Sequence, residues 1–324
     1  MLIPLLTILV AFAVLMWSAD MFVAGAASIA ENMGMSPVII GLTIVSLGTS
    51  APEILVSVTA ALADSGGLAI GNAVGSNIAN IGLVLGITVL IAPIQLHPSC
   101  LRSELPTLLL VTAGTGLLLL DVELERSDGI LMITALILIM AQMIRAQVRD
   151  PEVVQDAEEE ELPHLKPTRA WGAFGIGLVL LVGSSKVLVS GATAIAIQFG
   201  VSELLIGLTI VAVGTSLPEL AATLASALRG HAEIAIGNIV GSNLFNLLAV
   251  MAMPALLAPD QLPDNFLLRD YGAMCLATVL LAAAAYQGLH HSRAQPGHSY
   301  LGRGVGTLLC LGYALYYYGL YTSL

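Results

Sequence analysis

Long apolar runs dominate the pattern of hydrophobic and polar positions along this chain. Residues 104–120 and 127–144 hold near-continuous stretches of Leu, Ile, Val, Ala and Met. A run of about 18 or more such residues is long enough to cross a bilayer. Because lipid offers no hydrogen-bond partners, the backbone of such a segment must satisfy itself, which it does as a helix. A membrane barrel would instead show short alternating segments. The pattern therefore predicts an all-α integral membrane protein.

Ten helices are expected along the chain, separated mostly by short turns that carry Gly, Pro, Asn or Asp. They lie near residues 2–30, 37–62, 68–93, 104–120, 127–146, 170–198, 203–228, 233–258, 270–286 and 301–321. The one long polar stretch, 147–168, contains the acidic run from Asp156 to Glu161, and we interpret it as a cytoplasmic linker. It separates a first membrane unit, residues 1–146, from a second, residues 169–324.

The two units are copies of one another at two motifs. The segment from Gly41 to Glu53, GLTIVSLGTSAPE, recurs from Gly207 to Glu219 as GLTIVAVGTSLPE, and ten of the thirteen positions are identical. A second block, AIGNAVGSNIAN, ends at Asn80 and recurs as AIGNIVGSNLFN, ending at Asn246, with nine of twelve positions identical. The spacing is 166 residues for both (219 − 53 and 246 − 80).

An odd number of spans in each unit fixes how the copies are related. With five spans each, the second unit enters the membrane from the opposite face, which makes an inverted repeat of the kind found in secondary transporters. The expected fold is therefore ten transmembrane helices arranged as two inverted five-helix repeats, with broken helices 2 and 7.

The first motif should break its helix. Pro52 lacks an N–H and obstructs the carbonyl of Gly48, four residues earlier, so one or more carbonyls are freed. Such carbonyls are tolerated in a bilayer only where they are buried or line a cavity. Thr49 and Ser50 add hydroxyl oxygens, and Glu53 adds a carboxylate near the middle of the membrane, where an ionisable group indicates function. The second copy supplies the equivalent residues Thr215, Ser216, Pro218 and Glu219.

The second motif places polar side chains on one helix face. Ser76 and Asn80 are four residues apart, as are Ser242 and Asn246, so each pair shares a face. We interpret these four as the lining of a cavity, whereas the neighbouring glycines are equally well explained as a close packing seam.

Together the motifs predict a site made only of oxygen ligands. Calcium takes about 6–8 oxygen ligands, and the absence of His and Cys argues against zinc or copper. Two glutamates supply two negative charges, which balance one Ca²⁺ or two Na⁺.

Composition and charge agree with a membrane protein and suggest its orientation. The chain is 57% hydrophobic and 10% charged, whereas soluble proteins carry about 25% charged residues. With the N-terminus outside, eight basic residues fall in cytoplasmic connections and two, Arg126 and Arg269, in external ones, as the positive-inside rule requires. An even number of spans then returns the C-terminus outside. The eight are Arg102, Arg145, Arg149, Lys166, Arg169, Arg229, Arg293 and Arg303.

At the paired GTSxPE and GSNxxN blocks the sequence resembles the calcium/cation antiporter superfamily, in particular the sodium/calcium exchangers and their prokaryotic relatives. The resemblance covers effectively the whole chain. It implies exchange of sodium for calcium by alternating access, with the first and sixth spans sliding against a static core. By position it implies cation binding by Thr49, Ser50, Glu53, Ser76, Asn80, Thr215, Ser216, Glu219, Ser242 and Asn246, with contributions from the carbonyls of Ser46 and Ala212 to sodium sites.

The resemblance also sets further expectations. Some relatives, including potassium-dependent exchangers, carry Asp at the position of Asn246, so potassium co-transport is not expected here. The long regulatory loop of animal exchangers is missing, which favours a compact prokaryotic member in the plasma (inner) membrane. We expect calcium and sodium ions and the lipid bilayer as partners, with no cofactor and no nucleic acid, and a site that a monomer can complete.

Three other functions are alternatives to sodium/calcium exchange. A proton/calcium antiporter is the main alternative, because a buried Glu can take a proton. A cation channel fits an inverted repeat poorly. An intramembrane hydrolase is disfavoured, because all six histidines lie in or near loops and cannot serve a mid-span serine as a base.

Two charged residues inside spans remain outside the motifs. Asp20 and Lys186 are related by the same spacing (186 − 20 = 166). An unpaired charge in a bilayer costs at least a few kcal/mol, so the two either pair with one another near the midplane or make separate contacts near the two membrane faces.

Overall fold

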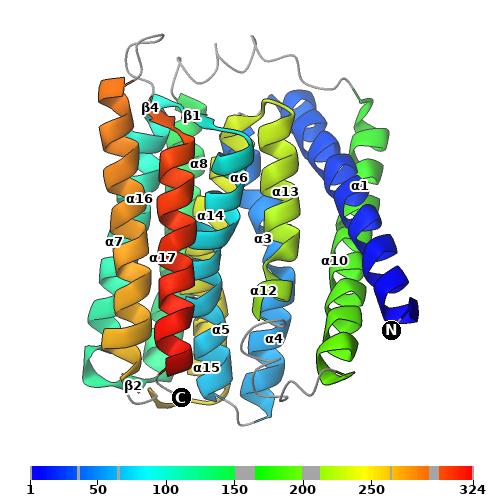
Figure 1. Cartoon of the computed structure of the whole chain (residues 1–324). Coiled ribbons are helices and arrows are strands. Elements are labelled where there is room, and N and C mark those ends of the chain that lie inside the picture. The colour runs from blue at the N-terminus through cyan, green and yellow to red at the C-terminus, as the bar shows by residue number, and fades with distance from the viewer. Residues whose placement is uncertain are drawn as a thin grey trace.

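The computed structural model describes residues 2–34, 37–63, 66–149, 165–198, 212–262, 265–291 and 299–322. These ranges are almost wholly helical, and the helices run side by side between two ends of the molecule (Figure 1). Within them, seven helices are long and apolar enough to cross a membrane, and a bent helix pair makes an eighth candidate. The prediction of an all-α membrane protein is thus confirmed.

Several of the membrane segments are divided into shorter helices. The helices of the first unit are α1 (Leu2–Met33), α2 (Pro37–Ile40), α3 (Ser46–Thr49), α4 (Ala51–Leu62), α5 (Gly66–Ala79), α6 (Gly86–Ile91), α7 (Leu105–Leu118) and α8 (Arg126–Arg149). Those of the second are α10 (Pro167–Gln198), α12 (Ala212–Thr215), α13 (Leu217–Leu228), α14 (Ala232–Phe245), α15 (Ala252–Leu257), α16 (Gly272–His291) and α17 (Arg303–Thr322). The π-helical segments are η1 (Gly41–Val45), η2 (Asn80–Leu85), η3 (Cys100–Glu104), η6 (Asn246–Val250) and η7 (Phe266–Tyr271), and η4 (Leu119–Asp121) is a 3₁₀ turn.

The sequence spacing of 166 reappears in the bounds of the helices. It separates the starts of α4 and α13 (217 − 51), of α5 and α14 (232 − 66) and of α6 and α15 (252 − 86). It also separates the π-helical segments that begin at Asn80 and Asn246, and π-bulges often occur at functional sites. Figure 1 shows α4 and α13 running from the middle of the molecule toward opposite ends. Equivalent sequences therefore adopt equivalent local structure in the two units.

Two short antiparallel strand pairs, which the hydrophobic pattern did not predict, join the units. β1 (Ile94–Leu96) pairs with β4 (Ser299–Leu301), and β2 (Glu123–Leu124) pairs with β3 (Asp260–Gln261). β1 follows α6 of the first unit and β4 precedes α17 of the second. In the same way, β3 follows α15 of the second unit and β2 precedes α8 of the first. Figure 1 shows β1 and β4 at one end of the molecule and β2 at the other. Backbone hydrogen bonds thus tie each unit to its copy at both ends.

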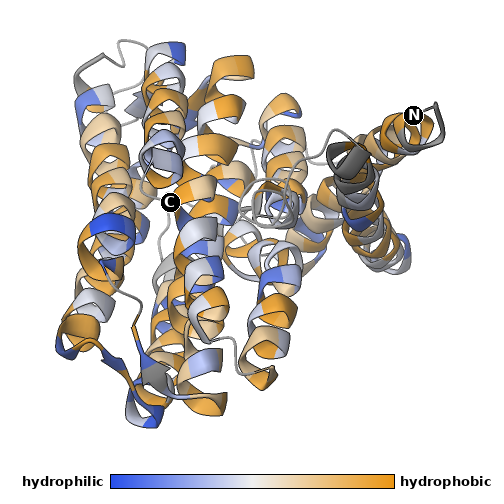
Figure 2. Cartoon of the chain, turned by 60° about the horizontal axis from the view of Figure 1, so that its bottom comes forward, coloured by the Kyte–Doolittle hydropathy of each residue, from blue (hydrophilic) through white to orange (hydrophobic). Residues whose placement is uncertain are grey.

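Buried apolar side chains form two separate clusters. The larger lies where α5 to α8 meet α14 to α17 and includes Ile81, Leu105 and Leu244. The smaller lies between α1, α10, α13 and η1, where the rings of Phe22 and Phe174 stack with centroids 4.8 Å apart. Figures 1 and 2 show α1 and α10 at one edge of the bundle. This helix pair therefore packs on the rest of the protein through its own core.

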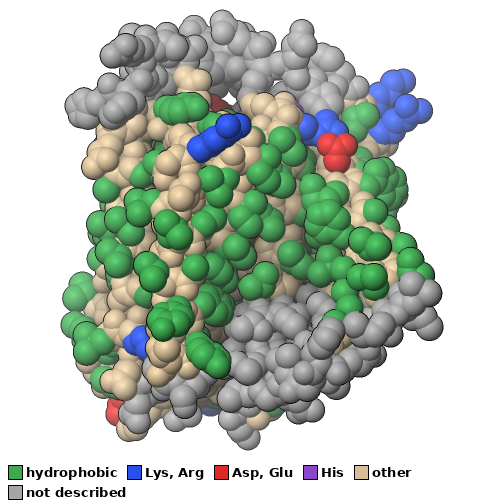
Figure 3. Space-filling model, in the orientation of Figure 1, with side chains coloured by type: hydrophobic (Ala, Val, Ile, Leu, Met, Phe, Trp, Pro, Cys, Tyr) green, Lys and Arg blue, Asp and Glu red, His purple; other side chains and the backbone are tan. Residues whose placement is uncertain are grey.

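The outer surface has the composition expected of a membrane protein. Large apolar side chains such as Leu110, Leu268 and Leu315 are exposed, at 71%, 88% and 69%. Figure 3 shows hydrophobic side chains covering the face between the two ends, with the basic and acidic side chains gathered toward the ends. Extensive exposed apolar surface of this kind, on helices long enough to cross a bilayer, indicates contact with lipid.

Asp20 has a partner other than Lys186. Its carboxylate accepts a hydrogen bond from the Nε of Arg229, which directly follows α13. Lys186 is exposed on α10. In the described part of the chain, Asp20 and Lys186 form no pair with one another, so the first alternative is wrong. The contact instead joins α1 to the end of α13.

Candidate cation-binding site

The first motif contains the predicted break. The axes of Gly41–Thr49 and Ala51–Leu62 differ in direction by 50°. Ser50 lies at the break with φ −82° and ψ 2°, outside helical geometry. Pro52 stands in the first turn of α4, where its missing N–H leaves the helix unable to continue across Ser50. The break predicted for the second span is confirmed.

The second motif copy breaks in the same way. Ser216 separates α12 from α13 with φ −87° and ψ 5°, close to the values of Ser50, and Pro218 stands in the first turn of α13. The part of this copy before Ala212 lies outside the described residues. Two equivalent sequences therefore form two equivalent turns at which side chains and carbonyls can converge.

The two carboxylates that follow these turns are buried. Glu53 is 0% exposed and Glu219 is 1% exposed. The hydroxyl of Ser50 donates to Oε1 of Glu219 across 3.2 Å, so the turn of one copy touches the acid of the other. Two negative charges thus share one dry interior, which favours a cation between them.

A chain of hydrogen bonds connects the first break to α14. Thr49 donates through Oγ1 to Oδ1 of Asn238 at 3.1 Å and lies 3.5 Å from the hydroxyl of Ser242. The amide of Asn238 in turn donates to Thr223 on α13 at 2.8 Å. Because Asn238 receives the proton of Thr49, the lone pairs of the Thr49 oxygen remain available to a cation.

A second network joins α5 to α14. Asn80 donates through Nδ2 to Oδ1 of Asn243 at 3.2 Å, and Asn77 donates to the carbonyl of Asn243 at 3.3 Å. Asn72 donates to the carbonyl of Glu53 at 3.0 Å. The bonds from Asn77 and Asn80 hold α5 and the following η2 to α14, and the bond from Asn72 holds α5 to α4.

Several buried oxygens beside these networks have no hydrogen-bond partner in the described part of the chain. A buried polar atom without a partner costs about 1–3 kcal/mol, so a group of them in one place indicates that something else satisfies them. A hard cation would do so. The atoms are Oε1 and Oε2 of Glu53, Oε2 of Glu219, the hydroxyl of Ser216, Oδ1 of Asn80 and Oδ1 of Asn246.

The predicted side-chain ligands lie at the two breaks or on the helices that face them. Thr215 is half-buried, and the others are buried. The buried ones are Thr49, Ser50, Glu53, Ser76, Asn80, Ser216, Glu219, Ser242 and Asn246.

The two predicted carbonyl ligands, of Ser46 and Ala212, differ in what the structure shows of their hydrogen bonds. The carbonyl of Ser46 accepts a hydrogen bond from the backbone N–H of Ser50, at 2.9 Å, and lies 3.3 Å from the hydroxyl of Thr49, which could donate to it in place of Asn238. While Thr49 donates to Asn238, one lone pair of the Ser46 carbonyl remains available to a cation. Ala212 is the first residue of α12. Cation binding by either carbonyl stays a prediction.

Four asparagines that hold helices or ligands in place were not assigned a role from the sequence. Asn77 and Asn243 connect α5 to α14, Asn238 holds Thr49, and Asn72 holds the carbonyl of Glu53. The signal that could have found them is their presence in both copies at the spacing of 166 (238 − 72 and 243 − 77).

The two sides of the site differ in exposure. At the start of α5, Gly71 is exposed and Asn72 is half-buried, whereas their equivalents on α14, Gly237 and Asn238, are buried. A Cβ at Gly41 would lie 3.1 Å from Cα of Gly237, while one at Gly71 would meet no described residue within 4 Å. Gly207, the counterpart of Gly41, lies outside the described residues. Among the described residues, the start of α14 is therefore more tightly packed than the start of α5.

Comparison with known proteins places this arrangement in a family. The model of the sodium/calcium exchanger protein family matches residues 3–145 and 169–322. The chain belongs to the sodium/calcium exchanger family. Its match leaves out the whole acidic linker, 147–168, and covers nearly all of both units.

Individual relatives agree with this assignment. The putative antiporter CaxA of Alkalimonas amylolytica is 46% identical over 288 residues, 87% of this chain and 89% of its own length. The inner membrane protein YrbG of Escherichia coli (strain K12) is 37% identical, over 99% of this chain and 98% of its own. The sodium/calcium exchanger MaX1 of Methanosarcina acetivorans is 29% identical over 85% and 89%.

A solved structure extends the likeness to the fold. The sodium-calcium exchanger NCX_Mj, soaked with sodium and strontium, matches with a TM-score of 0.81 and 28% identity, over 97% of each chain. As a member of the sodium/calcium exchanger family the chain is a transporter and not an enzyme, and its activity is calcium/cation antiport across a membrane.

Proposed function

We propose that this chain exchanges sodium for calcium by alternating access at the site between the two broken helices. The ligands are the oxygens of Thr49, Ser50, Glu53 and their equivalents Thr215, Ser216 and Glu219, with Ser76, Asn80, Ser242 and Asn246, and with the carbonyls of Ser46 and Ala212 serving sodium. All of them belong to one chain, so a monomer completes the site.

The single observation that carries this proposal is the pair of buried carboxylates with unpartnered oxygens. Glu53 and Glu219 have three carboxylate oxygens without partners among the described residues. Two negative charges without a cation are costly in a dry interior, and one Ca²⁺ or two Na⁺ would balance them. Competition between the two ions for the same charges is what couples their movements.

The proposed architecture is ten transmembrane helices forming two inverted repeats. The equal helix spacings, the opposite directions of α4 and α13 and the reciprocal strand pairs support it. Units 1–146 and 169–324 are the repeats, and the linker 147–168 connects them. The edge position and separate core of α1 and α10 support a sliding motion of this pair against the other helices.

The orientation follows from the basic residues. With both termini outside, the linker, β1 and β4 lie in the cytoplasm and α5 begins at the outer face. The inner membrane of a prokaryote is the proposed location, in line with the inner membrane protein YrbG, to which the chain is similar.

Calcium flux into proteoliposomes tests the coupling ion. An outward sodium gradient at fixed pH should drive uptake of radioactive calcium, and dissipating the gradient should stop it. A pH gradient without sodium should drive no uptake. Uptake driven by pH alone would instead identify a proton/calcium antiporter, and flux that needs no counter-ion would identify a channel.

A further inference from the structure

One hydrogen bond connects the movable helix pair to a turn of the cation site. Ser185, on α10, donates through its hydroxyl to the carbonyl of Gly214, on α12, across 2.8 Å. Ser185 is 4% exposed, and Gly214 is buried. Gly214 directly precedes Thr215 and Ser216, two of the proposed ligands.

The carbonyl of Gly214 is available because of the helix break. In an unbroken helix it would accept a hydrogen bond from the residue four positions later, which is Pro218. Proline has no N–H, so that bond cannot form. A buried carbonyl inside a membrane needs another donor, and Ser185 supplies one from a different helix.

The first unit has no counterpart of this bond. The residue equivalent to Ser185 is Ala19 (185 − 166), and the residue equivalent to Gly214 is Gly48 (214 − 166). Ala19 is 0% exposed and carries no hydroxyl. In an inverted repeat the two access states arise when the units exchange conformations. The opposite state would therefore place Ala19, and not a serine, near the carbonyl of Gly48.

We infer that Ser185 is a positioning residue that favours the access state shown over the opposite one, by holding the carbonyl of Gly214 to the movable helix α10. This inference rests on the alternating-access mechanism of the proposed function, though not on sodium as the coupling ion. One neutral hydrogen bond changes an equilibrium by about two- to tenfold, so Ser185 should bias the two states by that factor.

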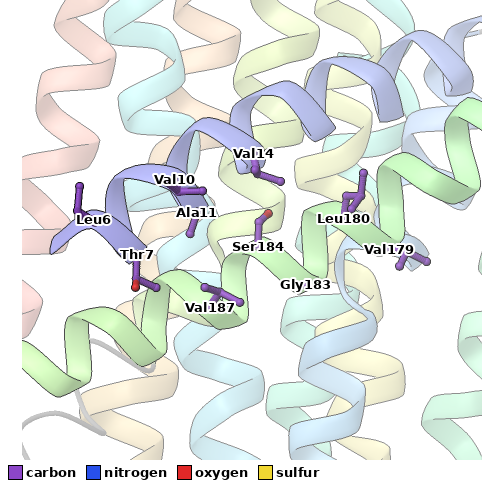
Figure 4. Close-up of a pocket in the computed structure, with 10 residues that line it drawn as sticks. All are labelled: Leu6, Thr7, Val10, Ala11, Val14, Val179, Leu180, Gly183, Ser184 and Val187. Atoms are coloured by element: carbon purple, nitrogen blue, oxygen red, sulfur yellow. The ribbon is translucent and has the colours of Figure 1, made fainter. Parts of the chain in front are cut away.

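A neighbouring serine provides a matched control. Ser184 is 7% exposed and donates to the carbonyl of Leu181, within its own helix. Figure 4 shows Ser184 among the residues that line a pocket of about 710 Å³ between α1 and α10, the other residues being mostly apolar. Ser184→Ala thus removes a buried hydroxyl from the same turn of α10 without touching the cation site.

Exchange of labelled for unlabelled calcium across sealed vesicles of each orientation tests the inference. Apparent affinity at one face scales with the fraction of protein open to that face, so the ratio of outer to inner apparent affinity reports the balance of states. Because calcium is exchanged for calcium, the result does not depend on whether sodium or protons drive net transport.

Ser185→Ala should change this ratio by about two- to tenfold, while Ser184→Ala leaves it unchanged. Ala19→Ser should shift it in the same direction, since it offers the carbonyl of Gly48 a donor in the opposite state, and this variant serves if Ser185→Ala fails to fold. A ratio that stays at the wild-type value in both Ser185→Ala and Ala19→Ser overturns the inference. An equal shift in Ser184→Ala, or equal weakening at both faces in Ser185→Ala, does so as well.

Discussion

At the scale of single residues, the two glutamates that follow the breaks are buried and carry carboxylate oxygens without a hydrogen-bond partner among the described residues. In the described part of the chain, Glu53 has no hydrogen-bond partner on either carboxylate oxygen, and Glu219 has one, from Ser50. Such groups are poorly placed for stability alone, because burying an unpaired charge is unfavourable. Their position is explained by the ion they would hold, and so replacing either should affect transport more than folding.

Glu53→Gln and Glu219→Gln should each lower calcium flux by about a hundredfold or more, because an uncompensated buried charge costs about 3–5 kcal/mol. Radioactive calcium uptake in proteoliposomes measures this. Glu123→Gln, which changes an exposed acid in β2, is the matched control and should transport normally. Near wild-type flux in either site variant would show that the glutamates are not ligands.

His231, which immediately precedes α14, should make stability depend on pH. Its burial, and then the charge of Arg229, lower the pKa of the imidazole from the ordinary value of 6.5. The unfolded chain therefore binds a proton at a higher pH than the folded protein does. The contribution of neutral His231 to the free energy of unfolding is therefore complete above pH 6.5. It is lost as the pH falls below 6.5 toward the pKa of His231 in the folded protein.

The melting temperature of purified protein should accordingly fall between pH 7 and pH 5 more steeply in the wild type than in His231→Gln. Differential scanning fluorimetry in detergent measures both curves. Parallel curves for the two proteins would contradict the assignment, and His290→Gln serves as a control for removing a histidine at another place.

At the scale of elements, the contact between α1 and α10 depends on two glycines. A Cβ at Gly25 would lie 2.4 Å from the backbone nitrogen of Phe174, and one at Gly177 would lie 2.7 Å from that of Phe22. Since backbone atoms cannot rotate away, any side chain at these positions would push the two helices apart. The two glycines therefore allow α1 and α10 to pack backbone against backbone.

Gly177→Ala should therefore destabilise the protein by about 1–3 kcal/mol, as overpacking does. Gly175→Ala, on the same helix, should be neutral or slightly stabilising, because a Cβ there meets nothing within 4 Å and alanine is the better helix former. Thermal unfolding of the two variants tests the contact. Equal melting temperatures would mean that the helices are not held in this approach.

At the scale of the whole molecule, the reciprocal strand pairs and the basic residues give the protein two distinguishable ends. Single cysteines, in a background without Cys100, Cys275 and Cys310, can report the orientation. Glu123→Cys, in β2, should react with a membrane-impermeant maleimide in intact cells, and Tyr300→Cys, in β4, should react only after the membrane is opened. The reverse pattern would place both termini in the cytoplasm.

The sequence alone determined the membrane class, the two copies, the broken helix at Ser50 and the acids that follow each break. These features are local. Apolar length decides whether a segment spans lipid, proline decides where its helix breaks, and a repeat is visible as identity at a fixed spacing.

Only the tertiary structure decided which groups meet. That Ser50 touches Glu219, that Asn238 holds Thr49, that Asp20 pairs with Arg229 and that Ser185 bonds to Gly214 all depend on how distant segments pack. The strand pairs between the units could not be predicted from the sequence either, because two or three residues carry too little pattern to indicate a strand. Side-chain partners and exposure are set by contacts between helices, which spacing along one helix cannot specify.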